Sequence, residues 1–423
     1  MAEGNLMVGK MKNLYDNLCR KEWNAMMTGV IIAILSILIM AWWRPWGAVG
    51  AVRNWGDWLL YYLGFYSDAD SLELIGFLNE DGESILTKSI WYDTGSVIGF
   101  GIIGGAFISA CLGGQFAFRF PPVREWVKAI IAGILMGIGS ALAGGCNVGG
   151  MYNALGNLAA NGFSMWLGLV VGVVLGLKLL YKEMEYITWG NGGAKTIDFP
   201  FPVQVVLGVA SLGLLIWGAY AYAGYDGDEA VEYINSLPGI LLISAAIGYS
   251  MQRGRWCMVQ GFREPHMTGD CTMAKSVALS IMIVAVGAAV LKYGVDMRFD
   301  GDPVLDPMNY VRGTFGLWGV LGGFIFGLGA MFAGGCGSGT LWRVGEGQMK
   351  LWLVVPFFGI SNSLMSAWFT EAEFEADGVL GLSVYLPDKF GYGPALLIIG
   401  LAMAIWYIIV TWNEDSNKLI VPM

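Results

Sequence analysis

The sequence has little charge and almost no histidine. Of its 423 residues, 13% are charged and 56% are apolar, and the mean hydropathy is +0.58. A soluble domain carries roughly a quarter charged residues, so this chain lacks the polar surface that would cover a core of such length. Lipid is the solvent that fits this ratio. The single histidine, His266, excludes a multi-histidine metal site and gives little support for general base catalysis.

Further absences narrow the possible functions. The net charge of −9 leaves no basic stripe to neutralise phosphates, which argues against a nucleic-acid partner. Six cysteines are too few for a disulfide scaffold and match no zinc-finger or haem-attachment spacing. The chain also lacks a P-loop, a dinucleotide fingerprint and a Ser/His/Asp grouping. We therefore expect no metal, no cofactor and no enzymatic activity. Charges inside the apolar runs are scarce, which leaves no obvious proton relay.

Long apolar runs are what the chain has in quantity. Ten of them, each of about 15 to 22 residues, are near the length that crosses a hydrocarbon core of roughly 30 Å. They lie at 26–43, 95–112, 128–145, 163–181, 203–222, 238–252, 274–292, 313–334, 350–368 and 394–412. The sequence therefore predicts an all-α integral membrane protein with about ten transmembrane helices, supplemented by short re-entrant or half helices.

The segments that connect these runs alternate in charge. Basic residues gather in the N-terminal segment and in every second connection: Lys10, Lys12, Arg20, Lys21, Arg119, Arg124, Lys182, Lys195, Arg253, Arg255, Arg263 and Arg343. The other connections are acidic, from Asp68 to Glu83, Asp226 to Glu232, Asp296 to Asp306 and Glu371 to Asp377, while 146–161 carries almost no charge. Because Lys and Arg mark the inner face, we expect the basic side to be cytoplasmic and both termini to lie inside.

An internal repeat joins the two halves of the chain. The segment from Gly133 to Cys146 resembles the segment from Gly323 to Cys336, 190 residues later, and half of the aligned positions are identical. The repeat unit is about five spans, and an odd number of spans inverts the second copy, as is typical of transporters. The alternative is that two glycine-rich spans look alike because both pack tightly. The predicted organisation is a cytoplasmic segment 1–25, a first repeat 26–222, an acidic external linker 223–236, a second repeat 237–412 and a cytoplasmic tail 413–423.

The two Gly-Gly-Cys corners carry the strongest signal for chemistry. Glycine weakens a helix by roughly 1 kcal/mol per residue, so each corner predicts a broken helix facing protein or water at membrane depth. The N–H groups of a following half-helix suit an anion, and a thiol beside them is soft and a weak donor. The candidate residues are Gly145, Cys146, Asn147 and Gly149 in the first copy, and Gly335, Cys336, Gly337 and Ser338 in the second. The structural alternative for each cysteine is a small buried hydrophobe.

Cys257 lies in a third glycine-containing corner. It follows Arg253-Gly254-Arg255-Trp256, and its counterpart in the first half is Gly47 of Arg44-Pro45-Trp46-Gly47. Arg255 is a candidate anion contact, although arginines there also satisfy the topology rule. The remaining cysteines, Cys19, Cys111 and Cys271, have no such companions and indicate packing. Cys146 is expected toward the outer end of its span and Cys336 toward the inner end of its own.

These motifs resemble the YeeE/YedE family of sulfur-transport membrane proteins. The resemblance rests on Arg44-Pro45-Trp46-Gly47, Ala143-Gly144-Gly145-Cys146, Gly254-Arg255-Trp256-Cys257 and Ala333-Gly334-Gly335-Cys336, and it covers about 26–412. It implies a prokaryotic inner-membrane location and, for some members, thiosulfate uptake past three thiols, here Cys146, Cys257 and Cys336. Other members are associated with a selenium compound. The long acidic connections 44–94 and 293–312 make this chain closer to that branch.

The resulting hypothesis is a transporter that brings a small sulfur-containing anion, such as thiosulfate, into the cytoplasm past cysteine thiols. Uptake of a selenium analogue by the same architecture is one alternative. A membrane thiol-redox or sulfur-relay protein is another, but it needs a cysteine pair that can close, and Cys146 and Cys336 are expected at opposite membrane ends. A structural subunit of a larger complex is a third. The expected partners are the anion, the lipid bilayer and a cytoplasmic acceptor of the sulfurtransferase type.

Overall fold

The computed structural model describes residues 2–422 except 80–81, 83, 188–189, 191, 228–229, 299–310 and 373–380. Within this part of the chain, ten helices are long and apolar enough to cross a membrane, as the sequence predicts. They are α2 (Ala25–Trp42), α5 (Thr94–Leu112), α6 (Val123–Leu142), α8 (Asn161–Tyr186), α9 (Phe201–Ala223), α10 (Val231–Arg253), α12 (Thr272–Asp296), α13 (Leu317–Ala333), α15 (Met349–Glu371) and α17 (Tyr392–Ser416).

Four short helical segments enter the bundle between the spanning helices. They are α3 (Ala48–Tyr62), the π-helical turn Asn147–Asn153 that continues into α7 (Ala154–Gly156), α11 (Met258–Met267) and α14 (Gly337–Gly345). The sequence predicts half-helices after the three cysteine corners but treats 44–94 as a connecting loop, and for α3 that expectation is wrong. Its 15 residues include Arg53, Asn54 and Asp57, so it is too short and too polar to read as a span, yet it packs between α5 and α15.

The remaining elements lie at the edges of the bundle. They are α1 (Ala2–Tyr15) with the π-helical turn Asp16–Arg20, α4 (Ala69–Leu74), the 3₁₀ turn Leu86–Lys88, α16 (Leu386–Phe390), β1 (Ala117–Phe120) and β2 (Lys195–Asp198). The two strands form an antiparallel pair with Ala117 opposite Asp198, which ties together two connections of the basic side. No pattern in the sequence predicted this strand pair.

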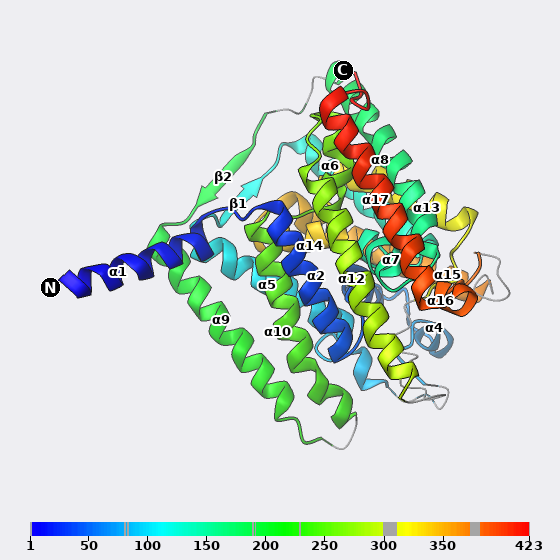
Figure 1. Cartoon of the computed structure of the whole chain (residues 1–423). Coiled ribbons are helices and arrows are strands. Elements are labelled where there is room, and N and C mark those ends of the chain that lie inside the picture. The colour runs from blue at the N-terminus through cyan, green and yellow to red at the C-terminus, as the bar shows by residue number, and fades with distance from the viewer. Residues whose placement is uncertain are drawn as a thin grey trace.

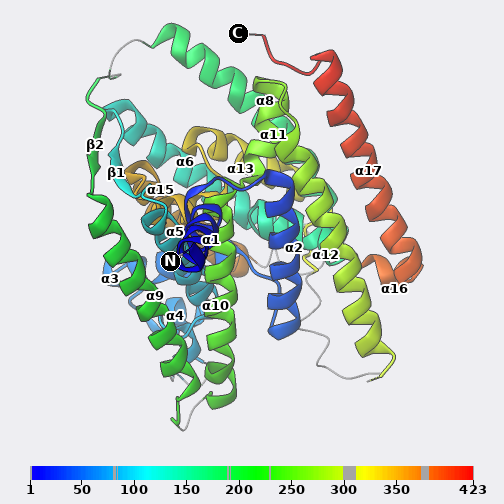
Figure 2. The same cartoon turned by 60° about the vertical axis from the view of Figure 1, so that its left-hand side comes forward.

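The spanning helices pack in matched sets. α6 packs on α15 and α8 packs on α13, with α6 and α13 in contact at the centre, while α5 packs on α10 and α2 on α12. Each of these contacts joins a helix of the first half of the chain to a helix of the second half. α9 and α17 lie on opposite flanks (Figures 1 and 2), and α9 exposes most of its large apolar side chains, as a helix facing lipid does.

Connections of one charge type meet on one side of the bundle. On the basic side, the Tyr15 hydroxyl donates to the Leu112 carbonyl (2.6 Å) and Arg253 donates to Gln115 (2.6 Å). On the acidic side, the Tyr392 hydroxyl donates to Asp296 (2.7 Å). These hydrogen bonds therefore join basic connections to each other and acidic connections to each other, as the charge pattern predicts. The acidic residues within 299–310 and 373–380 lie outside the described residues.

Glycines allow the central helices to cross at close range. A Cβ at Gly329 on α13 would lie 2.8 Å from the Met136 nitrogen and 2.9 Å from the Ala132 oxygen, both on α6. Real Cβ atoms do not approach backbone so closely, so the crossing of α6 and α13 depends on glycine. Small residues at crossings are typical of membrane helices, since close backbone contact supplies the van der Waals energy of association.

We predict that Gly329→Ala lowers the midpoint of thermal unfolding of the detergent-solubilised protein. Overpacking costs about 1–3 kcal/mol, more than the roughly 1 kcal/mol that alanine gains over glycine in a helix. The matched control is Gly213→Ala on α9, where the added Cβ meets nothing within 4 Å and stability should rise or stay unchanged. Equal midpoints for the two variants would contradict the close crossing.

Candidate functional site

The N-termini of all four short helical segments meet in the buried centre. Their N-cap residues are Gly47 for α3, Cys146 for the turn that leads into α7, Cys257 for α11 and Cys336 for α14. All three cysteines are 0–1% exposed. A helix N-terminus carries roughly half a positive unit charge on its free N–H groups, so this centre is electropositive without a formal charge.

The first corner surrounds Cys146 with backbone donors. The N–H groups of Val148 and Gly149 on its own segment, and of Ala48 and Val49 on α3, lie close enough to interact with its sulfur. The turn requires glycine at Gly144, because φ there is +68° in the left-handed region. Two helix N-termini therefore share one thiol.

The second corner places two thiols in contact. The sulfurs of Cys257 and Cys336 are 3.6 Å apart, and the Cys336 sulfur also accepts from the Gly339 N–H (3.2 Å) and lies 3.6 Å from the Ser338 hydroxyl. Gly334 supplies the turn with φ of +80°, as Gly144 does 190 residues earlier. The pair thus combines soft thiols with the N-termini of α11 and α14.

The two corners touch each other across Gly337. A Cβ added there would lie 3.0 Å from the Cys146 Cβ and 3.1 Å from its sulfur, so any side chain at this position would force Cys146 to shift. The expectation that Cys146 and Cys336 lie at opposite membrane ends is therefore wrong. Each helix stops inside the bundle instead of at its surface, because glycine breaks both helices there.

Two buried tryptophans brace these corners. The Trp46 indole donates to the Ser36 hydroxyl (2.7 Å), and the Trp256 indole donates to the Ser276 hydroxyl (3.0 Å). Both rings are 0% exposed, and each immediately precedes an N-cap, Gly47 or Cys257. The indole hydrogen bonds therefore fix where α3 and α11 begin.

Polar groups without partners line this centre. Asn147 is 0% exposed, and neither its amide nitrogen nor its oxygen has a hydrogen-bond partner among the described residues. The Thr340 hydroxyl on α14 is likewise buried and unsatisfied. Burying such groups costs about 1–3 kcal/mol each, so they indicate a place where a polar species binds.

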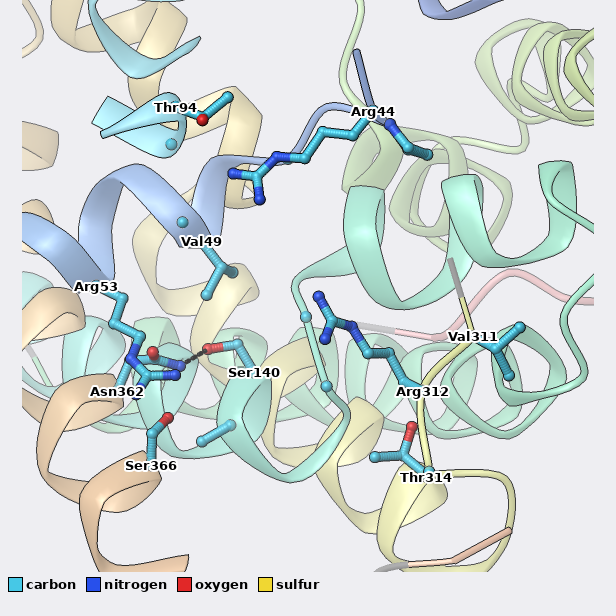
Figure 3. A pocket seen from close by; sticks show the side chains of 18 of the residues that line it. Arg44, Val49, Arg53, Thr94, Ser140, Val311, Arg312, Thr314, Asn362 and Ser366 are labelled. Carbon is cyan, nitrogen blue, oxygen red and sulfur yellow. Dashed lines mark hydrogen bonds between the residues drawn. The ribbon is translucent and has the colours of Figure 1, made fainter. Parts of the chain in front are cut away.

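A cavity of about 1150 Å³ leads to the first corner from the acidic side. Its wall includes Gly144 and Gly145 together with three arginines from separate segments: Arg44 after α2, Arg53 on α3 and Arg312 before α13. Figure 3 shows these arginines with Ser140, Asn362 and Ser366 around the cavity. Cys146 follows Gly145 in the chain but does not itself line this cavity.

An ion-pair network lies on the basic side of the thiol pair. Glu346, which ends α14, is 1% exposed and accepts from Arg255 through both carboxylate oxygens (2.8 and 2.7 Å) and from Arg119 (3.1 Å). Arg255 has φ of +49°, an unusual conformation for an arginine, which turns its side chain toward Glu346. Arg255 therefore pairs with a carboxylate, two residues away from Cys257.

The structure brings together the candidate residues that the sequence singles out: Cys146, Cys257, Cys336, Gly145, Gly335, Asn147, Gly149, Gly337 and Ser338 all lie at the touching corners. No pattern in the sequence singled out Arg53, Arg312, Ser140, Asn362, Thr340 or Glu346. Arg44 belongs to the Arg44-Pro45-Trp46-Gly47 motif, but no pattern in the sequence indicated that it lines the cavity. Among the described residues, no three His, Cys, Asp or Glu side chains gather to hold a metal ion.

Comparison with known proteins gives consistent matches. The family model described as sulphur transport matches residues 5–175 and 253–422. The probable transporter YedE of Escherichia coli K12 is 24% identical over 397 residues, 89% of each chain. The thiosulfate transporter TsuA of E. coli K12 is 33% identical over 127 residues, 30% of this chain and 33% of TsuA. TsuA of Spirochaeta thermophila is 32% identical over 120 residues, 28% of this chain and 33% of the relative.

We predict that Asn147→Ala leaves thermal stability unchanged or raises it, because the native amide has no partner to lose. The matched variant is Asn153→Ala six residues later, which is also buried but donates to the Trp46 carbonyl. Removing that donor should cost about 1–3 kcal/mol. Unfolding midpoints of the purified proteins test the contrast, and a larger loss for Asn147→Ala would show that its amide has a structural role.

Proposed function

Since this chain belongs to the sulphur transport family, we propose that it takes up a small sulfur-containing anion such as thiosulfate through a central path lined by cysteine thiols. The family and the named transporters among its relatives support transport rather than catalysis. The observation that carries the proposal is the convergence of four helix N-termini on three buried thiols, next to an unsatisfied Asn147 amide.

The proposed path runs from the outer cavity to the basic side. Arg44, Arg53 and Arg312 attract the anion, and Cys146 is the first thiol it meets. Cys336 and Cys257 follow across Gly337. Thiols and backbone N–H groups bind an anion more weakly than a fixed cation does, and weak successive sites let an ion leave as well as enter.

An inverted repeat is part of this proposal. The matched packing of α6 on α15 and α8 on α13, together with the 190-residue offset of the corners, supports two halves of opposite direction. The grouping of basic connections on one side supports an inner-membrane protein with both termini in the cytoplasm. The acceptor on that side, in this proposal, is a protein of the sulfurtransferase type.

A second function is favoured by one specific contact. The sulfurs of Cys257 and Cys336 are 3.6 Å apart, so a modest approach would allow a disulfide, as a thiol-redox or sulfur-relay protein requires. Titration of free thiols in isolated membranes, with and without reductant, distinguishes the two functions. The selenium alternative is tested by competition, because a selenium oxyanion that uses the same path reduces uptake of labelled thiosulfate.

We predict that Cys146→Ala, Cys257→Ala and Cys336→Ala each lower thiosulfate uptake at least about tenfold, since each removes one donor to a charged ligand. The measurement is the initial rate of ³⁵S-thiosulfate uptake into proteoliposomes. The control is Cys111→Ala, a buried cysteine packed against Phe116 away from the path. Uptake that survives replacement of all three path cysteines would end the thiol mechanism.

The cavity arginines give a separate prediction. The double variant Arg44→Gln/Arg312→Gln should weaken the apparent affinity for thiosulfate about tenfold and flatten its dependence on salt, because surface charges act through screened attraction. Arg298→Gln is the matched control, an exposed arginine at the same side that does not line the cavity. If Arg298→Gln weakened the apparent affinity as much as the double variant does, the effect would come from positive charge anywhere on this side of the protein and not from the cavity.

A further inference from the structure

The outer cavity contains an arginine whose nearest carboxylate is buried beside it. Arg53 and Asp57 lie one turn apart on α3, with the Arg53 Nε 4.0 Å from an Asp57 oxygen. The Arg53 side chain is 39% exposed and lines the cavity, whereas the Asp57 side chain is 6% exposed. The Arg53 guanidinium therefore faces the cavity, and the Asp57 carboxylate is buried in the protein behind the cavity wall.

Asp57 is poorly compensated as an anion. Its Oδ1 is buried without a hydrogen-bond partner among the described residues, and its contact with Arg53 is long. On the side away from the cavity, α15 packs against α3, and the backbones of the two helices approach at Gly56 and Gly359. The polar neighbour of Asp57 on α15 is Ser363, whose hydroxyl is hydrogen-bonded to the Tyr66 hydroxyl (3.0 Å). A buried charge in such surroundings is costly, and protonation relieves the cost.

The charged groups that face Asp57 come from two elements. They are Arg53 on α3 itself, and Lys88 and Asp93 from the segment before α5, while α15 contributes the neutral Ser363. Burial outweighs the two cations and raises the pKa of Asp57 to about 6. The free protein therefore holds this carboxyl mainly ionised at pH 7.5 and mainly protonated at pH 5.5.

We propose that Arg53 and Asp57 form a proton-coupled subsite for the transported anion, in which Arg53 captures the anion and Asp57 takes up a proton. The proposal rests on the proposed function and adds a second ligand to it, the proton. While Asp57 is ionised it neutralises part of the Arg53 charge. An anion bound at Arg53 places more negative charge near Asp57 and favours its protonated form.

The two ligands therefore help each other by the same factor. Coupling between two binding events is reciprocal, so if the anion promotes protonation of Asp57, protonation must tighten binding of the anion. Thiosulfate itself stays a dianion across this pH range, so the effect belongs to the protein. Because the anion enters on the acidic side, a lower external pH would load the subsite.

The test is thiosulfate binding by the purified full-length protein. We expect ³⁵S-thiosulfate to bind about tenfold more tightly at pH 5.5 than at pH 7.5, and binding at pH 7.5 to remove roughly half a proton per bound anion from a weakly buffered solution, read with a pH indicator. Asp57→Asn keeps the shape and mimics the protonated acid. It should bind with an affinity independent of pH and take up no proton.

Two controls keep the outcome interpretable. Glu73→Gln removes an exposed carboxylate from α4 and should keep the wild-type pH dependence. Thermal unfolding shows whether Asp57→Asn folds. Folding raises the pKa of this carboxyl from 3.8 to about 6. Its contribution to the free energy of unfolding is therefore fully present below pH 3.8 and is lost as the pH rises through about 6. The variant should therefore melt above the wild type at pH 7.5.

The possible failures are distinct. A wild-type protein that binds thiosulfate equally at both pH values, or an Asp57→Asn variant that keeps the full pH dependence, overturns the proton coupling alone. A wild-type protein that binds no thiosulfate at either pH overturns the proposed function as well.

Discussion

The positive ends of four short helices, directed at one buried point, are the constraint on which the rest of this structure depends. Free N–H groups lie at the N-termini of α3, α11, α14 and the turn that leads into α7. They create an electropositive centre where no arginine or lysine could be held without a large desolvation cost. In the proposed function, a centre built in this way attracts an anion yet binds it weakly. The thiols of Cys146, Cys257 and Cys336 then supply soft contacts in place of hard cationic ones.

Such an arrangement also leaves helix C-termini that need compensation. The Lys292 ammonium, fully buried on α12, lies 3.5 Å from the carbonyl of Asn157, where the first half-helix ends. At the end of α14, Glu346 is held by Arg119 and Arg255. Formal charges therefore lie at the C-terminal ends of two of the half-helices, and Arg343 adds one beside the Gly334 corner.

In the proposed inverted repeat, the two halves differ in chemistry. Gly47 and Cys257 occupy equivalent corners, so the outer corner has one thiol and the inner corner has two. Asn153 and Arg343 are also 190 residues apart; the first binds the Trp46 carbonyl, and the second binds the Gly334 carbonyl and lies over the Trp342 ring (4.9 Å). The number of thiols thus increases from the outer corner to the inner corner, which is the direction of uptake in the proposal.

The sequence alone predicted the ten spans, the alternation of basic and acidic connections and the residues at the glycine corners, because hydrophobic length, charge in connections and helix-breaking glycines are local properties. It could not give α3, whose Arg53 and Asp57 look like loop residues until α15 buries one face of the helix. It also placed Cys146 and Cys336 apart, since span ends normally reach the surface. Other features come from the tertiary structure alone: both helices stop inside the bundle and meet across Gly337, and arginines from three distant segments line one cavity. Such contacts depend on how helices cross and not on any local pattern.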